Sequence, residues 1–446
     1  MADDLGYGEV GVFGQKIIET PNIDKLASNG MILTNHYSGA PVCAPARAVL
    51  MTGLHTGKNP VRGNDEWRER GDVWSFEAMF KDPSLEGQRP LPDTIQTVAN
   101  YLKSNGYKTG MVGKWGLGAP NTSSIPTLKG FDFFYGYNCQ RQAHTLYPSH
   151  LWKNGERDIL NNKIVNKGKL AQGLDPYMEE SYQDYNQNDY APTLMHNEAL
   201  GFLDRNKNNN FFLYYASPIP HLPLQAPLKW VNYYREKFGK EEPYLGDDGY
   251  YPNISPMATY AAMISYLDQQ VGEIVSKLKE IGQYENTLII FTSDNGPWLN
   301  FGNHAGSTGG LREGKGTSFE GGQRVPTVMM WPDVIPAGKI ANQLSSAIDI
   351  LPTVCHIVDG NLPKHKIDGV NIMEILKGEK VNPRKEFYYY YKDNNLEAVR
   401  KDNWKLILPH TSRSYKGVLP NNDGFPGKYS SIQTGLELYN YFDQVE

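Results

Sequence analysis

The fold is indicated most clearly by the stretch Leu288-Ile289-Ile290-Phe291-Thr292-Ser293-Asp294-Asn295-Gly296. Four consecutive apolar residues predict a fully buried strand, and the Asp, Asn and Gly that follow predict a turn at its end. A long helix is expected just before this strand, because apolar residues recur at helical spacing at Val271, Ile274, Val275 and Leu278. Such a combination is typical of a mostly parallel sheet with helices on both faces.

Similar signals alternate along the rest of the chain. Thr20-Pro21 opens a short expected helix, and Asp93 is expected to cap another that ends at Gly106. Strands are expected at 107–112 and 211–215. The alternation predicts an α/β fold, a large mixed and mostly parallel sheet sandwiched by helices. Polar residues at the carboxyl ends of such strands are where an open α/β sheet usually places its site.

The tail of the chain has a different pattern. Short aromatic-rich runs at 387–391, 396–400 and 404–408 predict a small antiparallel sheet. We therefore expect a catalytic α/β domain at 1–380 and a C-terminal antiparallel subdomain at 381–446.

Composition narrows the choice of partners. With 446 residues, 39% of them hydrophobic and 21% charged, the chain has the make-up of an ordinary folded globular protein. A net charge of −5 without a basic run argues against nucleic acid or an anionic membrane surface as the main partner. No apolar run is long enough to span a bilayer. Three scattered cysteines are too few for a disulfide framework or a zinc site.

The two ends of the chain look incomplete. Met1-Ala2-Asp3-Asp4 resembles a strand cut just before its end, and Glu446 comes soon after a strand-like run at 436–439. We therefore expect a fragment with truncated ends. No secretory leader is visible, which in a fragment says little about localisation.

Two polar pairs, Asp3-Asp4 and Asp294-Asn295, each follow an expected strand. Three carboxylates and an amide offer only oxygen ligands, which suit calcium or magnesium better than zinc. Either pair alone is more readily explained as a turn or helix cap. Their joint presence with the motif described next favours a site for a hard cation.

That motif is Pro41-Val42-Cys43-Ala44-Pro45-Ala46-Arg47-Ala48-Val49-Leu50-Met51-Thr52-Gly53. A helix start and an arginine one turn later would favour the thiolate of Cys43, although a plain reactive or buried structural cysteine is the alternative. The string C-x-P-x-R followed by L-x-T-G resembles the activation signature of the type I sulfatases, in which the cysteine is oxidised to formylglycine. The hydrate of that aldehyde would offer hydroxyl oxygens to a hard cation, which a soft thiolate suits poorly.

Four further segments resemble the same family and stand in the family's order. They are the first metal motif at 2–8, the second signature at 106–115, the second metal motif at 292–296 and the active-site lysine segment at 314–322. The resemblance covers nearly the whole chain. It implies an alkaline-phosphatase-like α/β fold and a sulfuric ester hydrolase of the arylsulfatase A-like, bacterial carbohydrate sulfatase type.

The resemblance also implies a metal and a nucleophile. One calcium ion would be held by Asp3, Asp4, Asp294, Asn295 and the formylglycine derived from Cys43. One hydroxyl of the aldehyde hydrate would attack sulfur as the sugar alcohol leaves, and the second would expel sulfate from the formylglycine-sulfate intermediate.

Basic residues would complete the site. By the same resemblance, Arg47 would orient the formylglycine hydrate, and Lys114 and Lys315 would neutralise sulfate oxygens. His221 would help to protonate the leaving alkoxide, and a loop histidine bonded to backbone is the alternative. The formal positive charge of calcium and the three basic side chains exceeds the negative charge of the three aspartates by two. The pocket would therefore attract a sulfate monoester.

One residue departs from the family pattern. The family usually continues its second signature with a histidine after G-K-W, whereas this chain has Gly116. That histidine is thought to accept a proton when sulfate is expelled. His144 and His304 are candidates to fill the space, and each could equally be a substrate contact or a surface residue.

The substrate is only coarsely indicated. Asn64, Arg141 and His144, together with Trp152, are candidate sugar contacts, and a solvated loop residue is an equal alternative for each. The Gly-Lys-Trp-Gly and Cys-Gln-Arg-Gln-Ala-His stretches resemble those of bacterial polysaccharide-degrading sulfatases, which favours a sulfated galactose or N-acetylgalactosamine. The family resemblance further implies a periplasmic or secreted location and a formylglycine-generating maturation enzyme as partner.

Two other functions remain open from the sequence. A phosphate or phosphonate ester hydrolase of the same superfamily can share the Cys-x-Pro-x-Arg motif. A non-catalytic binder of sulfated glycans would result if Cys43 stayed unmodified. Comparing rates on sulfate and phosphate esters, or finding binding without hydrolysis, would separate these readings.

Overall fold

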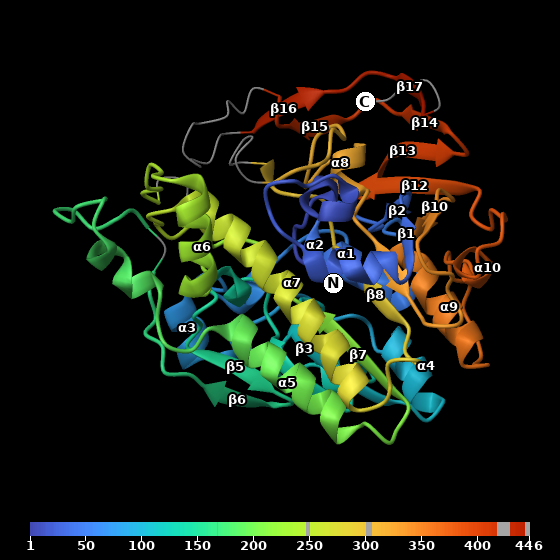
Figure 1. Ribbon diagram of the computed structural model, residues 1–446, viewed down its shortest axis with the longest axis horizontal. Helices are drawn as coiled ribbons and strands as arrows, with labels where there is room; N and C mark the ends of the chain where they lie inside the picture. The colour runs from blue at the N-terminus through green and yellow to red at the C-terminus, as the bar shows by residue number, and fades with distance from the viewer. Residues whose placement is uncertain (167, 247–249, 300–305, 417–428, 442–446) are drawn as a thin grey trace.

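Two sheets form the centre of the protein in its computed structural model, which describes residues 1–166, 168–246, 250–299, 306–416 and 429–441 (Figure 1). The first sheet has the strand order β6-β5-β4-β3-β7. Its strands are β3 Lys108–Lys114, β4 Phe133–Tyr137, β5 His150–Lys153, β6 Glu156–Ile159 and β7 Phe211–Ala216. β3 is parallel to β4 and to β7, whereas β5 is antiparallel to both of its neighbours.

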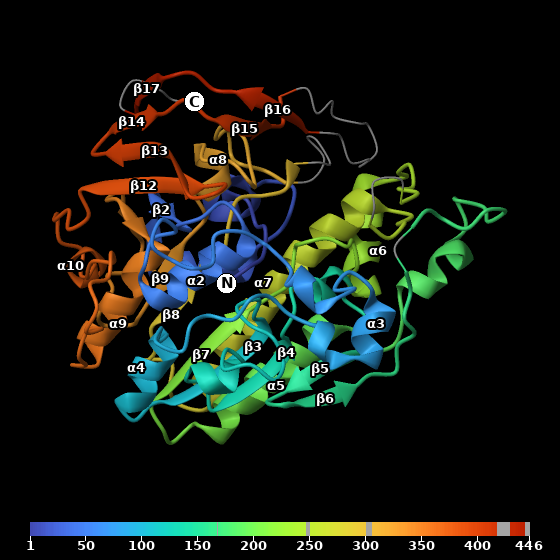
Figure 2. The ribbon, with the colours of Figure 1, turned by 180° about the vertical axis from the view of Figure 1, so that it is seen from behind.

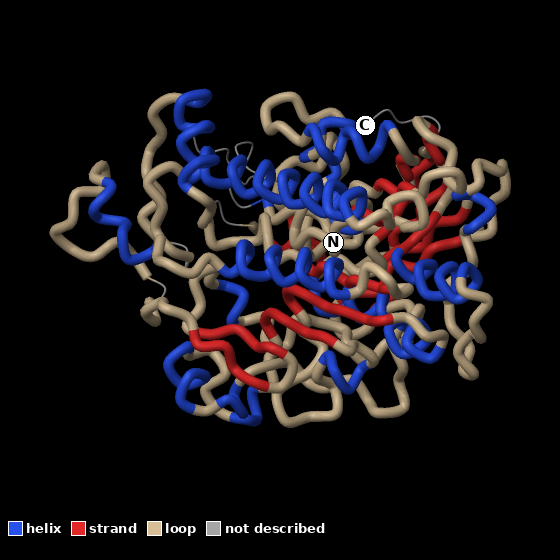
Figure 3. Tube along the Cα trace, turned by 60° about the horizontal axis from the view of Figure 1, so that its bottom comes forward, coloured by secondary structure: helices blue, strands red, loops and turns tan. Residues whose placement is uncertain are grey.

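The second sheet has the order β10-β1-β9-β8. Its strands are β1 Met31–Leu33, β8 Ile289–Phe291, β9 Val328–Met330 and β10 Lys339–Ala341. β1 is parallel to β10 and antiparallel to β9, which in turn is antiparallel to β8. β2 His36–Tyr37 and β11 Ser345–Ser346 form a two-stranded parallel pair. Along the chain, β2 follows β1 and β11 follows β10. Figure 3 shows the strands of the two sheets on either side of the N-terminus of the chain.

Helices cover both faces of these sheets. On the face seen in Figure 1 lie α1 Pro21–Ser28, α5 Ala191–Arg205, α6 Leu228–Phe238 and α7 Pro256–Glu280. On the opposite face, seen in Figure 2, lie α2 Cys43–Thr52, α3 Phe76–Lys81, α4 Val98–Ser104 and α9 Ile350–Ile357. The short helices α8 Glu320–Gln323 and α10 Met373–Leu376 lie nearer the C-terminal strands. No helix within the described ranges combines the length and the apolar character needed to cross a membrane.

The C-terminal strands form two small antiparallel sheets. The larger has the order β12-β13-β14-β17, with β12 Glu386–Tyr391, β13 Asn395–Lys401, β14 Trp404–Ile407 and β17 Glu437–Asn440. The smaller pairs β15 Thr411–Ser414 with β16 Ser430–Gln433. The three strands predicted for the tail are therefore confirmed as β12, β13 and β14. The boundary between 380 and 381 stays a prediction.

Most predicted elements of the main domain are confirmed, as is the α/β class with mixed sheets. One helix start is wrong. α4 begins at Val98 rather than after Asp93, because Pro90 and Pro92 keep the chain before it irregular and Thr97 takes the position before the first turn. There the side-chain oxygen of Asn100 accepts a hydrogen bond from the Thr97 N–H at 2.9 Å.

The burial predicted for Leu288 to Phe291 is also partly wrong. Phe291 is buried, but Ile289 and Ile290 are only half-buried. The reason is that, among the residues the structure describes, β8 is hydrogen-bonded to β9 alone and lies at the edge of its sheet, just as β7 lies at the edge of the other. The expected large sheet is thus present as two sheets, and β7 and β8 are the edge strands at which they are separated.

Candidate active site

The two polar pairs meet because Ala2 pairs with Ser293, the second residue after β8. Ala2 N–H donates to Thr292 O at 2.8 Å and Asp294 N–H donates to Ala2 O at 3.1 Å, which makes a parallel bridge. Asp4 N–H also donates to Asp294 Oδ1 at 3.1 Å. The chain turns sharply here, since Asp4 has φ of 65°. Because both pairs follow parallel segments, all four polar side chains reach the same end of the sheet, as predicted.

Cys43 faces these carboxylates from the first residue of α2. Its Sγ lies 3.3 Å from Asp3 Oδ1 and 3.9 Å from Asp4 Oδ1, and only 1% of the residue is exposed. Burial and the charge of Asp3 raise the pKa of the thiol, so it stays protonated at neutral pH. The expectation that the helix start and Arg47 would favour a thiolate is therefore wrong: desolvation and a neighbouring anion outweigh both. The sulfur occupies the place that the hydroxyl oxygens of a formylglycine hydrate would take.

Arg47, one turn further along α2, links three segments of the site. Its Nη1 donates to Lys114 O at 2.7 Å, and its Nη2 donates to Asp294 Oδ2 at 2.9 Å and lies 3.4 Å from Asp3 Oδ2. The side chain is fully buried, and its pKa is raised because the carboxylates of Asp294 and Asp3 outweigh the cost of burial. Arg47 therefore fixes the start of α2 against β3 and against one aspartate of each polar pair.

Lys114 and Lys315 each contact one carboxylate of the first pair. Lys114 Nζ donates to Asp3 Oδ2 at 2.6 Å, and Lys315 Nζ donates to Asp4 Oδ2 at 2.6 Å. Burial works against both ammonium groups, but the aspartates outweigh it and raise the pKa of both lysines. Burial also raises the pKa of Asp3, yet Lys114 leads the groups that outweigh it and hold that pKa well below its usual range. The two lysines are thus charged at neutral pH.

The oxygen donors of the site fit a hard cation. Ligand atoms of four buried residues lie within 4.8 Å of one another, namely those of Asp3, Asp4, Cys43 and His221. Asn295 Nδ2 donates to Asp4 Oδ1 at 2.7 Å, whereas its Oδ1 is buried and has no hydrogen-bond partner in the described part of the chain. Burial and the charge of Asp3 raise the pKa of Asp294, a shift that a bound cation would reverse. The orphaned amide oxygen and the crowded carboxylates are what calcium or magnesium would satisfy.

His221 reaches the site from the loop after β7. Its Nδ1 bonds Leu222 O at 2.7 Å, and its Nε2 lies 3.6 Å from Asp4 Oδ2. Because a carbonyl can only accept, Nδ1 carries a proton and Nε2 is the nitrogen that faces the site. Burial, helped by the charge of Lys315, lowers the pKa of His221 to about 4. His221 is therefore a neutral imidazole at neutral pH, and its role as a proton donor stays a prediction.

The predicted sugar contacts lie in two places. Asn64 Oδ1 accepts hydrogen bonds from Ala44 N–H at 2.9 Å and Gln140 Nε2 at 3.4 Å, so Asn64 holds the start of α2. Arg141 and His144 lie together on the side of His221: Arg141 Nη1 is 3.3 Å from His144 Nδ1, and the rings of His144 and His221 are stacked with centroids 5.0 Å apart. The structure thus brings the second group to the site.

Trp152 does not fit its predicted role. The residue is 6% exposed, and its Nε1 donates to Glu86 Oε2 at 2.7 Å inside the molecule. The ring is buried because it packs in the apolar cluster that also contains Trp115 and Phe134. A different aromatic residue, Trp74, is 46% exposed. The guanidinium carbon of Arg141 lies over its ring, 4.5 Å from the ring centroid. A lone tryptophan in a loop carries no pattern that marks it as a partner of Arg141.

Gly116 has a backbone conformation that disfavours the family's histidine. Its φ is +71°, and a Cβ at this position would lie 2.6 Å from Gln140 Cγ. Any L side chain would therefore strain the backbone and displace Gln140. Of the two candidate replacements, His144 lies against His221, and His304 falls outside the described residues.

The sequence also missed a link from the C-terminal strands to the site. Tyr415 OH donates to Lys315 O at 2.9 Å, and Arg413 Nη1 donates to the same carbonyl at 3.4 Å. Glu313, two residues before the lysine, accepts from Ser414 Oγ and from Tyr415 N–H, both at 2.7 Å. The segment that carries Lys315 is thus held by residues about 100 positions further along the chain, which no local pattern could indicate.

The site combines two polar pairs, a helix start with a buried thiol and three charged basic side chains in one buried cluster of an α/β fold. These are the features of a hydrolase for anionic esters. Comparison with known proteins identifies the family. A family model described as Sulfatase matches residues 1–360, and the chain belongs to this family of sulfuric ester hydrolases. A second model, described as N-sulphoglucosamine sulphohydrolase, C-terminal, matches residues 314–415. The family implies formylglycine and a metal ion.

Individual relatives cover most of the chain. Human arylsulfatase A is 32% identical, over 91% of this chain and 73% of its own length. N-acetylgalactosamine-6-sulfatase of Canis lupus familiaris is 30% identical, over 96% of this chain and 74% of its own. Among solved structures, Ps i-CgsB in complex with k-i-k-neocarrahexaose is 29% identical with a TM-score of 0.71, covering 91% of this chain and 82% of that one.

Proposed function

We propose that the protein hydrolyses a sulfate monoester of a carbohydrate, with formylglycine derived from Cys43 and one calcium ion. The observation that carries this proposal is the position of Cys43: its sulfur is buried against Asp3 and Asp4 at the start of α2. A thiol kept protonated there is a poor nucleophile. When present, the formylglycine hydrate would supply the attacking hydroxyl, and calcium, held by Asp3, Asp4, Asp294 and Asn295, would polarise a sulfate oxygen.

The basic side chains would bind and stabilise the sulfate group. Lys114 and Lys315 point their ammonium groups at Asp3 and Asp4 from two different segments, so both border the space beside residue 43. A cation bound by the carboxylates would leave these ammonium groups available to sulfate oxygens. Charge on those oxygens would meet fixed positive groups in a buried pocket, where such interactions are strongest. Arg47 would keep the start of α2 in position throughout.

His221 would act on the leaving sugar oxygen. Its Nε2 faces the carboxylates, and its Nδ1 is fixed by Leu222 O, so the ring has one defined orientation. An anionic ester next to the imidazole would raise its pKa from the low value of the free site. The protonated ring could then donate from Nε2 to an alkoxide, which is a poor leaving group without a proton.

The sugar would lie on the side of Arg141 and His144. Arg141 is stacked on Trp74 and bonded to His144, so its guanidinium is held by two neighbours at a site next to His221. Planar polar and aromatic groups of this kind suit the hydroxyls and ring faces of a pyranose. The names of two relatives, an N-acetylgalactosamine sulfatase and a protein solved with a carrageenan-type hexaose, support a sulfated galactose or N-acetylgalactosamine. A periplasmic or secreted location would give the enzyme access to such a substrate. A formylglycine-generating enzyme would carry out its maturation.

Mass spectrometry of the peptide that contains Cys43 tests the proposal first. The protein is expressed with and without a formylglycine-generating enzyme, and Cys43→Ala serves as the unmodifiable control. We expect the mass change of thiol-to-aldehyde conversion only in co-expressed wild type, with sulfate release from sulfated sugars in that sample alone. Equal or faster release from the matching phosphate esters would instead identify a phosphoesterase. Tight binding of the sulfated sugar by fully converted protein, with no hydrolysis of any ester, would identify a glycan-binding protein.

A further inference from the structure

The surface beside Arg141 carries a second arginine on the same aromatic ring. The guanidinium carbon of Arg141 lies 4.5 Å from the ring centroid of Trp74, and that of Arg68 lies 5.6 Å from the same centroid. The two cationic groups are therefore within about 10 Å of one another, which is the Debye length at 0.1 M salt. Because like charges repel at this distance, an anion that contacts both groups would be bound favourably.

Neither guanidinium forms an ion pair with a carboxylate in the part of the chain that the structure describes. Arg141 donates from Nη1 to His144 Nδ1, and its Nε is buried without a hydrogen-bond partner among the described residues. A neighbouring arginine differs, since Arg89 forms an ion pair with Glu69. The positive charges of Arg68 and Arg141 are thus left for a ligand.

One carboxyl group, that of Glu66, lies close enough to Arg141 for their charges to interact. Burial raises the pKa of Glu66 to about 8, so most of this carboxyl group is protonated at neutral pH. A protonated carboxyl group carries no charge. Glu66 therefore leaves the positive charge of Arg141 uncompensated.

The two arginines are held at a fixed separation by hydrogen bonds between their segments. Glu66, two residues before Arg68, forms an antiparallel bridge with Gln88, and Gln88 Nε2 donates to Glu66 Oε2 at 2.7 Å. On its other side, Gln88 Oε1 accepts from Gln140 N–H at 3.2 Å. Gln88 thus connects the segment that carries Arg68 to the segment that carries Arg141. A site arranged in advance loses less conformational entropy when its ligand binds.

This pair of arginines lies next to the place proposed for the reacting sugar. Arg141 contacts His144, and the ring of His144 is stacked on His221 with centroids 5.0 Å apart. Arg68 lies further from His221, because Trp74 stands between it and Arg141. An acidic group that reaches Arg68 would therefore belong to the next sugar of an oligosaccharide.

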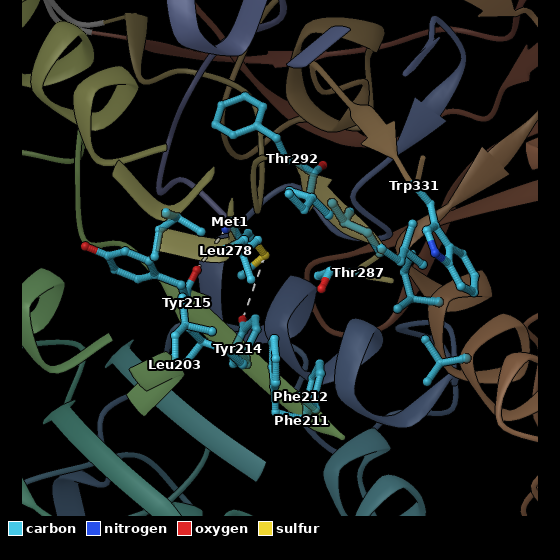
Figure 4. Close-up of a pocket in the computed structure, with 18 of the residues that line it drawn as sticks. Met1, Leu203, Phe211, Phe212, Tyr214, Tyr215, Leu278, Thr287, Thr292 and Trp331 are labelled. Atoms are coloured by element: carbon cyan, nitrogen blue, oxygen red, sulfur yellow. Dashed lines mark hydrogen bonds between the residues drawn. The ribbon is translucent and has the colours of Figure 1, made fainter. Parts of the chain in front are cut away.

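The largest cavity of the protein has no such groups. It lies between β7 and β8 and has a volume of about 340 Å³, and the described residues that line it include no arginine, lysine, aspartate or glutamate (Figure 4). Moving a charged group into such an apolar space is costly. An acidic sugar would therefore bind at the arginines and not in this cavity.

We propose that Arg68, Trp74 and Arg141 form a second subsite, which binds an acidic group, a sulfate or a carboxylate, on the sugar next to the one that loses its sulfate. This inference rests on the proposed function for the nature of the ligand. Planar guanidinium groups suit the oxygens of either anion, and Trp74, which is 46% exposed, offers apolar surface to the sugar ring. The preferred substrate is an oligosaccharide with acidic groups on neighbouring sugars.

Binding to defined disaccharides tests the subsite. Isothermal titration calorimetry is done with the calcium-loaded full chain carrying Cys43→Ala, so that no turnover occurs. One disaccharide has a sulfated galactose and an uncharged neighbour, and the other two add a sulfate or a carboxylate to that neighbour. We expect the second acidic group to lower Kd by at least about tenfold, and this gain to shrink at high salt. The larger gain of the two identifies the second group as sulfate or carboxylate.

Three further substitutions locate the effect. Arg68→Gln removes the charge and should reduce the gain to less than about twofold, whereas Arg68→Lys keeps the charge and should retain part of the gain. Arg205→Gln is the matched control, because Arg205 also lies over an aromatic ring, 5.1 Å from the centroid of Phe133. Phe133 begins β4, so this pair lies at the opposite end of the strand from the active site. The control should keep the full gain.

The same Kd for all three disaccharides would overturn the proposal. A gain that survives in Arg68→Gln would also overturn it, as would an equal loss of the gain in Arg205→Gln. Sulfate release by the formylglycine-containing wild type is measured on the same disaccharides. Release without any preference would overturn the subsite alone, whereas preferential binding without release would support the subsite and overturn the proposed reaction.

Discussion

The imidazole of His144 is stacked on the imidazole of His221, with ring centroids 5.0 Å apart and planes inclined by 28°. His221 is fixed through its Nδ1 to Leu222 O, and His144 closes the face of the ring beside Arg141. The histidine that faces the carboxylates is therefore positioned by a second histidine, which itself contacts the side where we place the sugar.

Replacing His144 separates these two functions. In His144→Phe the aromatic stack is kept and the Arg141 contact is lost, so we expect KM for the sulfated sugar to rise while kcat changes little. In His144→Ala both are lost, and kcat/KM should fall by about 10- to 100-fold. Steady-state kinetics measures both, with the exposed His356 replaced by Ala as a control. Equal kcat and KM in all four proteins would remove His144 from the site.

Lys315→Ala should lower turnover strongly, because its ammonium group is aimed at the carboxylates where the ester would react. We expect a loss of about 10²- to 10³-fold in kcat with an unchanged fold by circular dichroism. The exposed Lys339→Ala variant is the control and should keep full activity. A near-normal rate for Lys315→Ala would contradict its role.

Calcium should both activate and stabilise the protein. Removal by EGTA is expected to abolish activity, and calcium at about 100 times its Kd should add about 2.7 kcal/mol to the free energy of unfolding. Asn295→Ala removes the orphaned amide oxygen and should weaken calcium binding, whereas exposed Asn186→Ala should not. Isothermal titration calorimetry and thermal unfolding measure these effects. Full activity after EGTA treatment would refute the calcium assignment.

Glu66 should make stability depend on pH. Burial raises the pKa of this carboxyl to about 8, from an ordinary value of 4.5, and Gln88 Nε2 donates to it at 2.7 Å. Between these values the folded protein binds the extra proton, so the contribution of Glu66 to stability is full below pH 4.5 and is lost as pH rises towards 8. The loss approaches about 1.4 kcal/mol per pH unit in the middle of the window.

The variant Glu66→Gln keeps an acceptor for Gln88 and removes the titration. We expect urea unfolding midpoints of the two proteins to differ little at pH 5 and the variant to be more stable at pH 8. An equal difference at both pH values would show that Glu66 titrates normally.

Gly116→Ala should destabilise the protein more than Gly106→Ala. Both glycines have positive φ, +71° and +83°, so alanine costs about 1–2 kcal/mol of backbone strain at either position. Only at Gly116 does the new Cβ also meet a neighbour, Gln140 Cγ at 2.6 Å, whereas at Gly106 nothing lies within 4 Å. Urea unfolding of the two variants measures the difference. Equal losses would mean that Gln140 moves aside freely.

The parts of the site that follow strands could be predicted from the sequence. Asp294 and Asn295 come after an apolar run, and parallel segments end at one edge, so their meeting with Asp3 and Asp4 follows from local pattern and sheet geometry. The protonation of Cys43 could not be predicted, because it depends on how deeply α2 is buried and on the charge of Asp3. Local pattern also failed for Trp152, because its burial depends on tertiary packing in an apolar cluster. The start of α4 at Val98 is different: it depends on Pro90, Pro92 and Thr97, which the sequence does show.

The contact of Tyr415 with the Lys315 carbonyl has a consequence for exchanging parts between sulfatases. A chimera that took its C-terminal strands from one relative and its lysine segment from another would separate Tyr415 and Arg413 from the carbonyl they both bond. Even a well-folded hybrid would then present its lysine from an unsupported loop. The segment 313–316 and the strand β15 with the tyrosine after it should therefore be transferred as one cassette, and in natural sequences these two distant stretches are expected to vary together.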